Sequence, residues 1–228
     1  MAAVVAAIKK IVIVMDATNN TTDFHWSALE VQMRAYAHEA HVPIIVDEGL
    51  ALLEQIIRIQ RPSKILEIGT AIGFSAIRMH QVCNSQIYTI ERNQDMICLA
   101  KKNIQASGFD AQIHLIEQDA LEAFDSVKNE KFDLIFIDAA KAQYTKFFEI
   151  YTPLLTNRGI VITDNMSFHG LLDPKEYENQ SRSVKGLIRK LLSYRKFLLD
   201  HDNYDTTIFE IGDGIAVSVK KDEYANHK

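Results

Sequence analysis

The sequence has 228 residues, of which 47% are hydrophobic and 24% charged, and its formal net charge is −5 at pH 7. This is the composition of an ordinary globular protein, and the length fits one α/β domain. The negative charge excludes a protein whose whole surface binds polyanions, and a chain of this length can form a core without disulfide or metal cross-links.

The cysteines and the N-terminal segment bear on the compartment. Cys83 and Cys98 are the only cysteines, and both lie in apolar helical patterns. We expect both to be reduced thiols in the core, which indicates the cytoplasm. Residues 1–15 form an apolar run that is too short to cross a bilayer, with Lys9 and Lys10 in its middle. We therefore interpret residues 1–22 as a flexible or non-native extension of a single domain over residues 23–228, with no membrane association.

Two helices come first in the domain. Residues 26–40 have helical spacing of apolar side chains, and Pro43 opens a second helix over residues 44–60. From residue 64 onward, short apolar runs alternate with segments of helical period, a pattern that predicts a parallel sheet with helices on both faces. The predicted strands are 64–69, 86–91, 112–117, 132–138 and 159–164, and the predicted helices are 74–83, 93–107, 141–155 and a weaker one over 120–127.

The C-terminal part of the chain follows a different pattern. Residues 165–179 indicate a loop and residues 181–200 a helix. Two final apolar runs, 205–211 and 215–220, are separated by Gly212-Asp213-Gly214, and Asp-Gly between apolar runs is a hairpin signal. We therefore expect an α/β fold with an antiparallel hairpin at one edge, and the two N-terminal helices as a cap on the same domain.

The first motif with chemical content is a turn after the first predicted strand, where Gly69 and Gly73 enclose residues 70–72. Glycines at such a turn let the backbone approach a ligand, and the ligands of open α/β sheets bind at this edge. The spacing is G-x-x-x-G and differs from the G-x-G-x-x-G of dinucleotide-binding folds. A turn that simply requires small residues is the alternative.

Acidic residues follow the next two predicted strands. Glu91 lies 22 residues after Gly69, where a carboxylate can accept both hydroxyls of a ribose. Asp119 and Ala120 follow the third strand, where backbone groups can face an adenine. The alternatives are a surface glutamate and a helix N-cap aspartate. Beside the glycine turn, the pattern favours a nucleoside site.

Polar residues also end the fourth and fifth predicted strands. Asp138 ends the fourth, with Lys141 three residues later at a helix start, and Asp164 and Asn165 end the fifth. If these strands are neighbours, two carboxylates and an amide oxygen converge, which suits Mg²⁺, Mn²⁺ or Ca²⁺ better than zinc. The alternative is that Asp and Asn end strands because they form turns.

These motifs together resemble a known family, the cation-dependent O-methyltransferases of the catechol and caffeoyl-CoA types. The resemblance runs from about residue 42 to residue 221 and is carried by ILEIGT-x-x-G-x-SA, TIE, FIDAAK-x-x-Y, ITDN-x-x-x-x-G and the closing GDG. It implies a Rossmann-like class I methyltransferase fold, with a mostly parallel seven-stranded sheet and an antiparallel C-terminal hairpin. Within the family, segments 41–45, 64–80, 87–93, 136–148 and 162–172 look closest to the bacterial tRNA 5-hydroxyuridine methyltransferases.

The resemblance also implies roles for residues at matching positions. Lys141 matches the lysine treated as the general base in catechol enzymes, although a solvated lysine at a helix start is the alternative. Three departures stand out, namely Gln118 in place of glycine, Phe74 in place of tyrosine, and alanines at 139 and 140 in place of a bulkier pair. The implied S-adenosylmethionine site consists of Ile45, Glu67, Gly69, Thr70, Ser75, Glu91, Asp119, Ala120 and Asp138, the Mg²⁺ site (or that of another divalent cation) of Asp138, Asp164 and Asn165, and the catalytic pair of Asp138 and Lys141.

The acceptor is the least determined part of the prediction. The helix over 181–200 has six basic residues and no acidic one between Ser181 and Leu199, which indicates either a tRNA-binding face or a solvated helix face. We expect O-methylation of wobble 5-hydroxyuridine to 5-methoxyuridine, with a catechol or phenol methyltransferase as the alternative and an NAD-dependent oxidoreductase as a more distant one. We also expect a homodimer. The candidate RNA-binding residues are Arg182, Lys185, Arg189 and Arg195.

Overall fold

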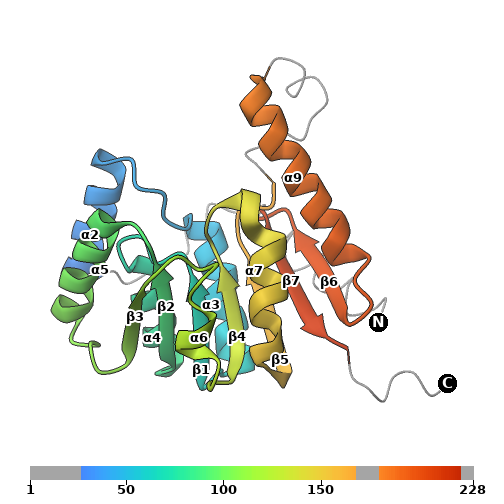
Figure 1. Ribbon diagram of the computed structural model, residues 1–228. Helices are drawn as coiled ribbons and strands as arrows, with labels where there is room; N and C mark the ends of the chain where they lie inside the picture. Colours follow the sequence, from blue (N-terminus) through green and yellow to red (C-terminus); the bar gives the residue numbers. More distant parts are fainter. Residues whose placement is uncertain (1–26, 168–179, 222–228) are drawn as a thin grey trace, which may run out of the picture.

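A seven-stranded sheet forms the centre of the computed structural model, which describes residues 27–167 and 180–221 (Figure 1). The strand order is β3-β2-β1-β4-β5-β7-β6, in which β1 to β5 are parallel and β7 runs antiparallel to both of its neighbours. The strands are β1 (Lys64–Ile68), β2 (Gln86–Glu91), β3 (Ile113–Glu117), β4 (Phe132–Ile137), β5 (Leu155–Thr163), β6 (Tyr204–Phe209) and β7 (Ile215–Lys220).

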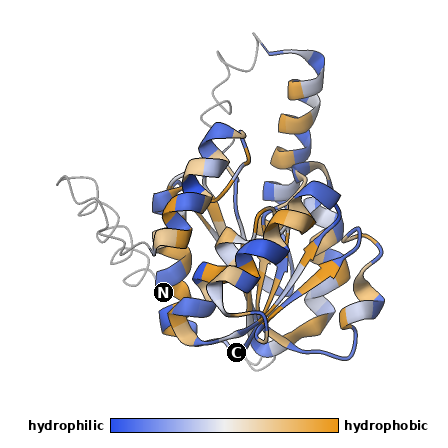
Figure 2. Ribbon diagram, turned by 90° about the vertical axis from the view of Figure 1, so that its left-hand side faces the viewer, coloured by the Kyte–Doolittle hydropathy of each residue, from blue (hydrophilic) through white to orange (hydrophobic). Residues whose placement is uncertain are grey.

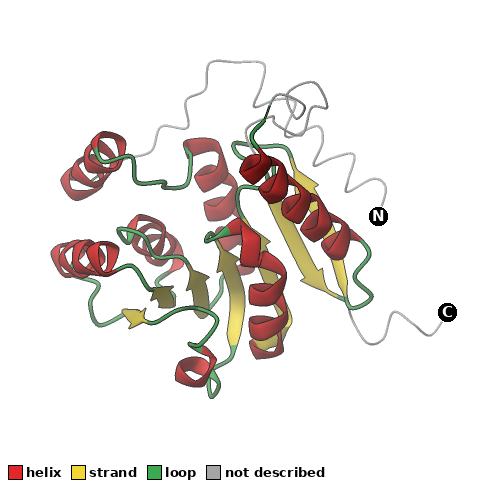
Figure 3. Cartoon of the chain, turned by 45° about the horizontal axis from the view of Figure 1, so that its top comes forward, coloured by secondary structure: helices red, strands yellow, loops and turns green. Residues whose placement is uncertain are grey.

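Helices cover both faces of this sheet (Figure 3). The apolar side chains of the strands divide into two core clusters, one on each face, because successive residues of a strand point to opposite sides. One face is covered by α2 (Ala28–Glu39), α3 (Asp47–Gln60), α4 (Phe74–Cys83) and α5 (Gln94–Ser107), and the other by α6 (Phe124–Val127), α7 (Tyr144–Tyr151) and α9 (Arg182–Leu199).

The predicted fold class is confirmed. Each predicted strand is present, and the two final runs form a hairpin with Phe209 paired to Ile215. The hairpin joins the sheet through β7, which pairs with β5, so that β6 forms the edge. β5 begins four residues earlier than predicted, at Leu155, because the β4–β5 ladder continues past a register irregularity near Phe132.

Several helix boundaries differ from the prediction. The second helix begins at Asp47, because residues 42–46 stay extended, with the N-cap residue Val46 at φ −73° and ψ 157°. The predicted helix over 141–155 divides into a 3₁₀ turn at Lys141–Gln143, α7, and a second 3₁₀ turn at Thr152–Leu154 that contains Pro153. The predicted helix over 120–127 is reduced to α6, whose start is preceded by turns.

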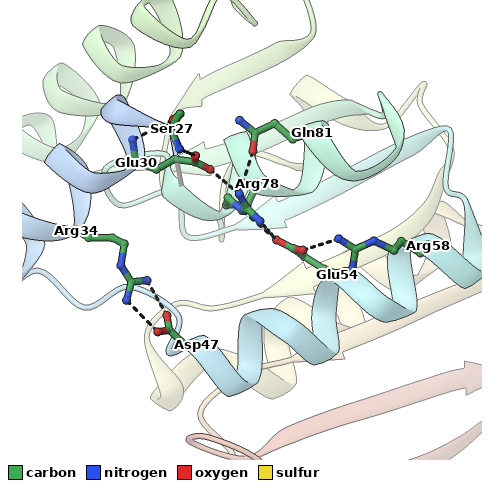
Figure 4. Close-up of polar contacts among 8 residues, drawn as sticks. All are labelled: Ser27, Glu30, Arg34, Asp47, Glu54, Arg58, Arg78 and Gln81. Carbon is green, nitrogen blue, oxygen red and sulfur yellow. Dashed lines mark hydrogen bonds and ion pairs between the residues drawn. The ribbon is translucent and has the colours of Figure 1, made fainter. Parts of the chain in front are cut away.

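Buried ion pairs attach α2 to the domain (Figure 4). The guanidinium of Arg78, on α4, binds Glu30 of α2 at 2.7 Å and Glu54 of α3 at 2.5 Å. Their side chains are 10%, 2% and 1% exposed, so this is a largely desolvated cluster. A second, more exposed pair joins Arg34 of α2 to Asp47 of α3 at 2.7 Å. Salt bridges from Arg78 therefore join both helices of the predicted cap to α4.

The structure also bears on the predictions for the cysteines, the N-terminal extension, the loop after β5 and membrane-spanning helices. Cys83 is half-buried, but Cys98 is exposed, so the prediction of two core thiols is wrong for Cys98, which lies on the outer side of α5. The predicted extension, residues 1–22, and most of the predicted loop, residues 168–179, lie outside the described residues. No helix in the described part of the chain is long and apolar enough to span a membrane.

Candidate active site

A cavity of about 600 Å³ opens at the carboxyl ends of the parallel strands. Its walls are residues 42–45, the turns after β1 to β4 and the 3₁₀ turn that begins at Lys141. Glu67 and Asp164 are not among the residues that line it, and they are 0% and 1% exposed. Ten of the predicted site residues line this cavity, namely Ile45, Gly69, Thr70, Ser75, Glu91, Asp119, Ala120, Asp138, Lys141 and Asn165.

The turn after β1 brings the backbone of two strands into close contact. Gly69 has φ +105°, and a Cβ added there would overlap the backbone carbonyl of Asp138. Its N–H donates to the carbonyl of Ile90 at 3.0 Å, and the Asp138 N–H donates to the carbonyl of Ile68 at 3.0 Å. The close approach of β1 to β4 therefore requires glycine at this position. This is a stricter requirement than that of the alternative, a turn that needs only small residues.

Glu67 acts on the cavity through its neighbours. The hydroxyls of Ser75 and Thr89 donate to its two carboxylate oxygens. Burial raises the pKa of Glu67 to about 7, and these hydrogen bonds oppose that increase. Of the three, only Ser75 lines the cavity, and Glu67 accepts the hydrogen bond of its hydroxyl from beneath, while the predicted contact of Glu67 with the cofactor stays a prediction.

The carboxylate of Glu91 is held by backbone donors at the tip of β2. Its Oε2 accepts the Ala71 N–H at 3.0 Å, and its Oε1 accepts the N–H groups of Arg92 and Asn93, both at 2.9 Å. These bonds fix the side chain between the glycine turn and the next helix. A carboxylate has about four lone-pair positions, so it keeps the capacity to accept a ribose hydroxyl. The nucleoside role of Glu91 stays a prediction.

The third strand tip combines the two interpretations considered for Asp119. Its Oδ1 accepts the Leu121 N–H at 2.9 Å, which stabilises the turn, and Arg92 donates to its Oδ2 at 2.8 Å. Ala120 lines the cavity beside it, while its carbonyl accepts the Tyr151 hydroxyl at 2.6 Å on the other side. Asp119 therefore caps a turn and also lines the cavity.

Asp138, Asp164 and Asn165 converge, as the positions of β4 and β5 in the sheet require. The Asn165 amide donates to Asp138 Oδ1 at 3.0 Å and to Asp164 Oδ2 at 3.3 Å. Burial raises the pKa of both carboxyl groups, and repulsion adds to it, from Glu67 in the case of Asp138 and from Asp138 in the case of Asp164. Asn165 reaches both of them from a left-handed backbone conformation, φ 63°. Three oxygen-bearing side chains thus meet at one point.

Lys141 lies at the start of the 3₁₀ turn after β4 and lines the cavity. Burial lowers the pKa of its ammonium, and the charges of Asp213, Asp138 and Asp164 oppose that decrease. A half-buried lysine among carboxylates differs from the solvated lysine of the alternative. The contribution of Asp213, from the β6–β7 hairpin, was missed by sequence analysis, although the Gly-Asp-Gly signal marked its position.

The basic residues of α9 do not behave alike. Arg182 and Arg189 are exposed, and Lys185 is half-buried. Arg195 is bound to the carbonyl of Met166 at 2.8 Å and to Glu210 at 2.9 Å. It supports the loop after β5, and this separates it from the other candidate RNA-binding residues.

The comparisons with known proteins agree with this geometry. A family model described as O-methyltransferase matches residues 21–221. The chain belongs to the O-methyltransferase family. It is similar to a crystal structure from Staphylococcus aureus provisionally assigned as a caffeoyl-CoA O-methyltransferase, with a TM-score of 0.81, 41% identity, and coverage of 94% of this chain and 100% of that one.

Curated relatives include catechol and caffeoyl-CoA O-methyltransferases. Catechol O-methyltransferase B of Danio rerio is 28% identical over 172 residues, which cover 72% of this chain and 64% of the relative. Caffeoyl-CoA O-methyltransferase of Populus kitakamiensis is 23% identical over 195 residues, which cover 82% of each chain. The protein is thus an S-adenosylmethionine-dependent O-methyltransferase of the catechol and caffeoyl-CoA type.

Proposed function

We propose that this O-methyltransferase is cation-dependent and that its acceptor is 5-hydroxyuridine at the wobble position of tRNA, which it converts to 5-methoxyuridine. The observation that carries the cation dependence is the convergence of Asp138, Asp164 and Asn165 beside the cavity. The tRNA acceptor draws its support from exposed basic residues of α9 and from the sequence segments that resemble tRNA methyltransferases.

The donor set fits a hard divalent cation such as Mg²⁺. Among the described residues, no group of three or more His, Cys, Asp or Glu side chains could hold a metal, so the amide of Asn165 is needed beside the two carboxylates. Burial disfavours the charged forms of Asp138 and Asp164, with repulsion from Glu67 on the first and from Asp138 on the second, and a divalent cation would offset that cost. Two carboxylates and an amide oxygen are ligands that Mg²⁺ and Ca²⁺ accept.

The reaction moves a methyl group from a sulfonium to an oxygen. The methyl carbon leaves the sulfur of S-adenosylmethionine and bonds to the acceptor oxygen, and the hydroxyl proton passes to Nζ of neutral Lys141. The cation, when bound, would favour the deprotonated acceptor and orient it. Burial lowers the pKa of Lys141, which increases the neutral fraction that a base requires.

The acceptor proposal depends on where α9 lies. The N-terminal half of this helix extends beyond the carboxyl edge of the sheet, the edge at which the cavity opens (Figures 1 and 2). Arg182, Arg189 and Lys190 are exposed there, while the buried Ile188 and Leu191 anchor the helix to the domain. Exposed cations next to an open site suit the phosphates of an anticodon loop. A wobble base is already unpaired, so little unstacking is needed.

The test is transfer of a labelled methyl group. The protein is incubated with labelled S-adenosylmethionine, Mg²⁺ and tRNA from a strain that lacks this gene, and the tRNA is digested to nucleosides. We expect label in 5-methoxyuridine, and we expect chelator or Asp164→Asn to abolish it. Label in a catechol with none in RNA would establish the small-phenol alternative instead.

Two variants locate the RNA contact. Arg189→Glu should raise the KM for tRNA and reduce its salt dependence, while the KM for S-adenosylmethionine stays the same. Lys102→Glu makes the same charge change at an exposed position of α5, on the other face of the sheet, and should leave both constants unchanged. Equal effects of the two variants would show that α9 is not the RNA-binding face.

A further inference from the structure

The two candidate metal ligands at the end of β5 lie in a short segment, residues 164–167, which we call the metal loop. The Asp164 N–H donates to the Ile137 carbonyl at 3.0 Å, and the Asp164 carbonyl accepts the Tyr144 hydroxyl at 3.2 Å. Asn165 has φ 63°, a left-handed conformation that asparagine tolerates better than most residues but that still needs support from its surroundings. The placement of both ligands therefore depends on what holds the backbone of this loop.

The turn of the β6–β7 hairpin holds one side of the metal loop. The Met166 N–H donates to the Gly214 carbonyl at 2.9 Å, and the Ser167 N–H donates to the Asp213 carbonyl at 2.8 Å. A Cβ added at Gly214 would overlap Ser167, so the two backbones are in direct contact. The hairpin thus fixes the loop after the ligands.

Two consecutive residues of α9 hold the chain on either side of the ligand pair. The Tyr194 hydroxyl shares a hydrogen bond of 2.9 Å with the hydroxyl of Thr163, the residue before Asp164. Arg195 donates from Nη1 to the carbonyl of Met166, the residue after Asn165, at 2.8 Å. Tyr194, Thr163 and Met166 are all buried. The helix therefore contacts the segment directly before and directly after the two ligands.

The guanidinium of Arg195 is itself held in place. Its Nη2 binds Glu210 Oε1 at 2.9 Å, and the other carboxylate oxygen of Glu210 accepts the Ser167 hydroxyl. The Arg195 side chain is 21% exposed, whereas that of the next residue, Lys196, is 79% exposed. A charged donor in a partly buried position makes a stronger hydrogen bond than a neutral one. Arg195 therefore joins α9, the hairpin and the metal loop.

We propose that Arg195 is a positioning residue for the divalent cation, because its bond to the Met166 carbonyl fixes the backbone from which Asp164 and Asn165 reach the ion. This inference rests on the proposed function, since it assumes a cation at Asp138, Asp164 and Asn165. An arginine has no acceptor atom and cannot bind a cation itself. Partners that orient metal ligands without touching the ion commonly contribute about 10–100-fold in metal affinity.

The sign of the effect separates positioning from a simple charge effect. A guanidinium near a divalent cation repels it, so loss of the positive charge alone would raise the affinity for the metal. Loss of a positioning contact would lower it, because the metal loop could then adopt other conformations. A decrease in affinity on removal of Arg195 is therefore a result that charge alone does not produce.

The test is Mn²⁺ binding by the full-length protein, measured from the electron paramagnetic resonance signal of free Mn²⁺. We expect Arg195→Met to lower the affinity by about tenfold or more, and Arg195→Lys to lie between it and the wild type, because an ammonium does not reproduce the fork of the guanidinium. Lys196→Met is the matched control, since it removes the same charge and an exposed pair with Asp200 on the same helix, and it should leave Mn²⁺ affinity unchanged. Calorimetry with S-adenosylhomocysteine should give similar affinities for all of these proteins, which shows that they are folded.

Unchanged or higher Mn²⁺ affinity in Arg195→Met would overturn the inference. If that variant does not bind S-adenosylhomocysteine, Arg195→Lys decides, and Mn²⁺ affinity equal to that of the wild type would then overturn it. Asp164→Asn distinguishes this failure from that of the proposed function. Mn²⁺ binding that survives Asp164→Asn places the cation elsewhere, so the proposed metal site and the role of Arg195 both fail. Mn²⁺ binding that is lost in Asp164→Asn but kept in Arg195→Met refutes the role of Arg195 alone.

Discussion

Replacement of Arg78 by methionine tests the buried ion cluster in Figure 4. The substitution keeps much of the aliphatic volume but removes the donors to Glu30 and Glu54, whose side chains are only 2% and 1% exposed. Glu54 keeps Arg58 at 2.8 Å, whereas Glu30 keeps only its cap bonds with Ser27. Breaking a buried pair from one side costs about 3–5 kcal/mol.

That cost is large compared with the stability of a domain of this size. Folded proteins are stable by only about 5–15 kcal/mol, and each kcal/mol corresponds to about 2–4 °C in melting temperature at this length. We therefore expect Arg78→Met to lower the melting temperature by roughly 6–20 °C. Arg34→Met is the matched control, because the Arg34–Asp47 pair is 31% and 46% exposed and should be worth about 1 kcal/mol or less.

The stability that the Glu30–Arg78 pair contributes should depend on pH. Burial alone would raise the pKa of Glu30, but hydrogen bonds from Arg78 and Ser27 outweigh it and hold the pKa below its usual value of 4.5. A lowered carboxyl pKa stabilises the fold above about pH 4.5, and this contribution is lost as the pH falls through the folded-state pKa. In urea titrations, the difference in free energy of unfolding between the wild type and Arg78→Met should therefore become smaller as the pH falls from neutral toward about pH 4. The same difference in free energy of unfolding at both pH values would refute the reasoning. So would an equal decrease in stability for Arg34→Met.

Two further predictions concern the site itself. Gly69→Ala should abolish binding of S-adenosylhomocysteine in calorimetry, because the added Cβ would overlap the backbone of Asp138. Gly108→Ala is the control: Gly108 has φ +76° and no atom within 4 Å of the added Cβ, so the substitution should lower the free energy of unfolding by only about 1 kcal/mol and leave binding intact. Retained binding in Gly69→Ala would contradict the close approach. Addition of Mn²⁺ should raise the melting temperature more as the pH increases from 6 to 8, because the raised carboxyl pKa values make protons compete with the metal. Asp164→Asn should show no such increase, and an increase equal to that of the wild type would place the metal elsewhere.

Local pattern determined most of the fold and the position of the site. Apolar runs alternate with helical segments, and Gly69, Glu91, Asp138 and Asp164 each stand at or just after the end of a strand, so these residues necessarily gather at one edge of a parallel sheet. The hairpin could also be predicted, because Gly-Asp-Gly between apolar runs specifies a turn through its own backbone preferences.

Tertiary contacts decided the rest. Helical spacing places Pro43 at a helix start, but the helix begins only at Asp47, and residues 42–45 form a wall of the cavity. Likewise, Arg195 follows the pattern of a basic face yet binds the loop after β5. The turn at Asp213 reaches the loop after β5 only because β7 pairs with β5, and there its backbone carbonyl accepts the N–H of Ser167. Each outcome depends on residues far apart in the sequence, and local periodicity does not encode such contacts.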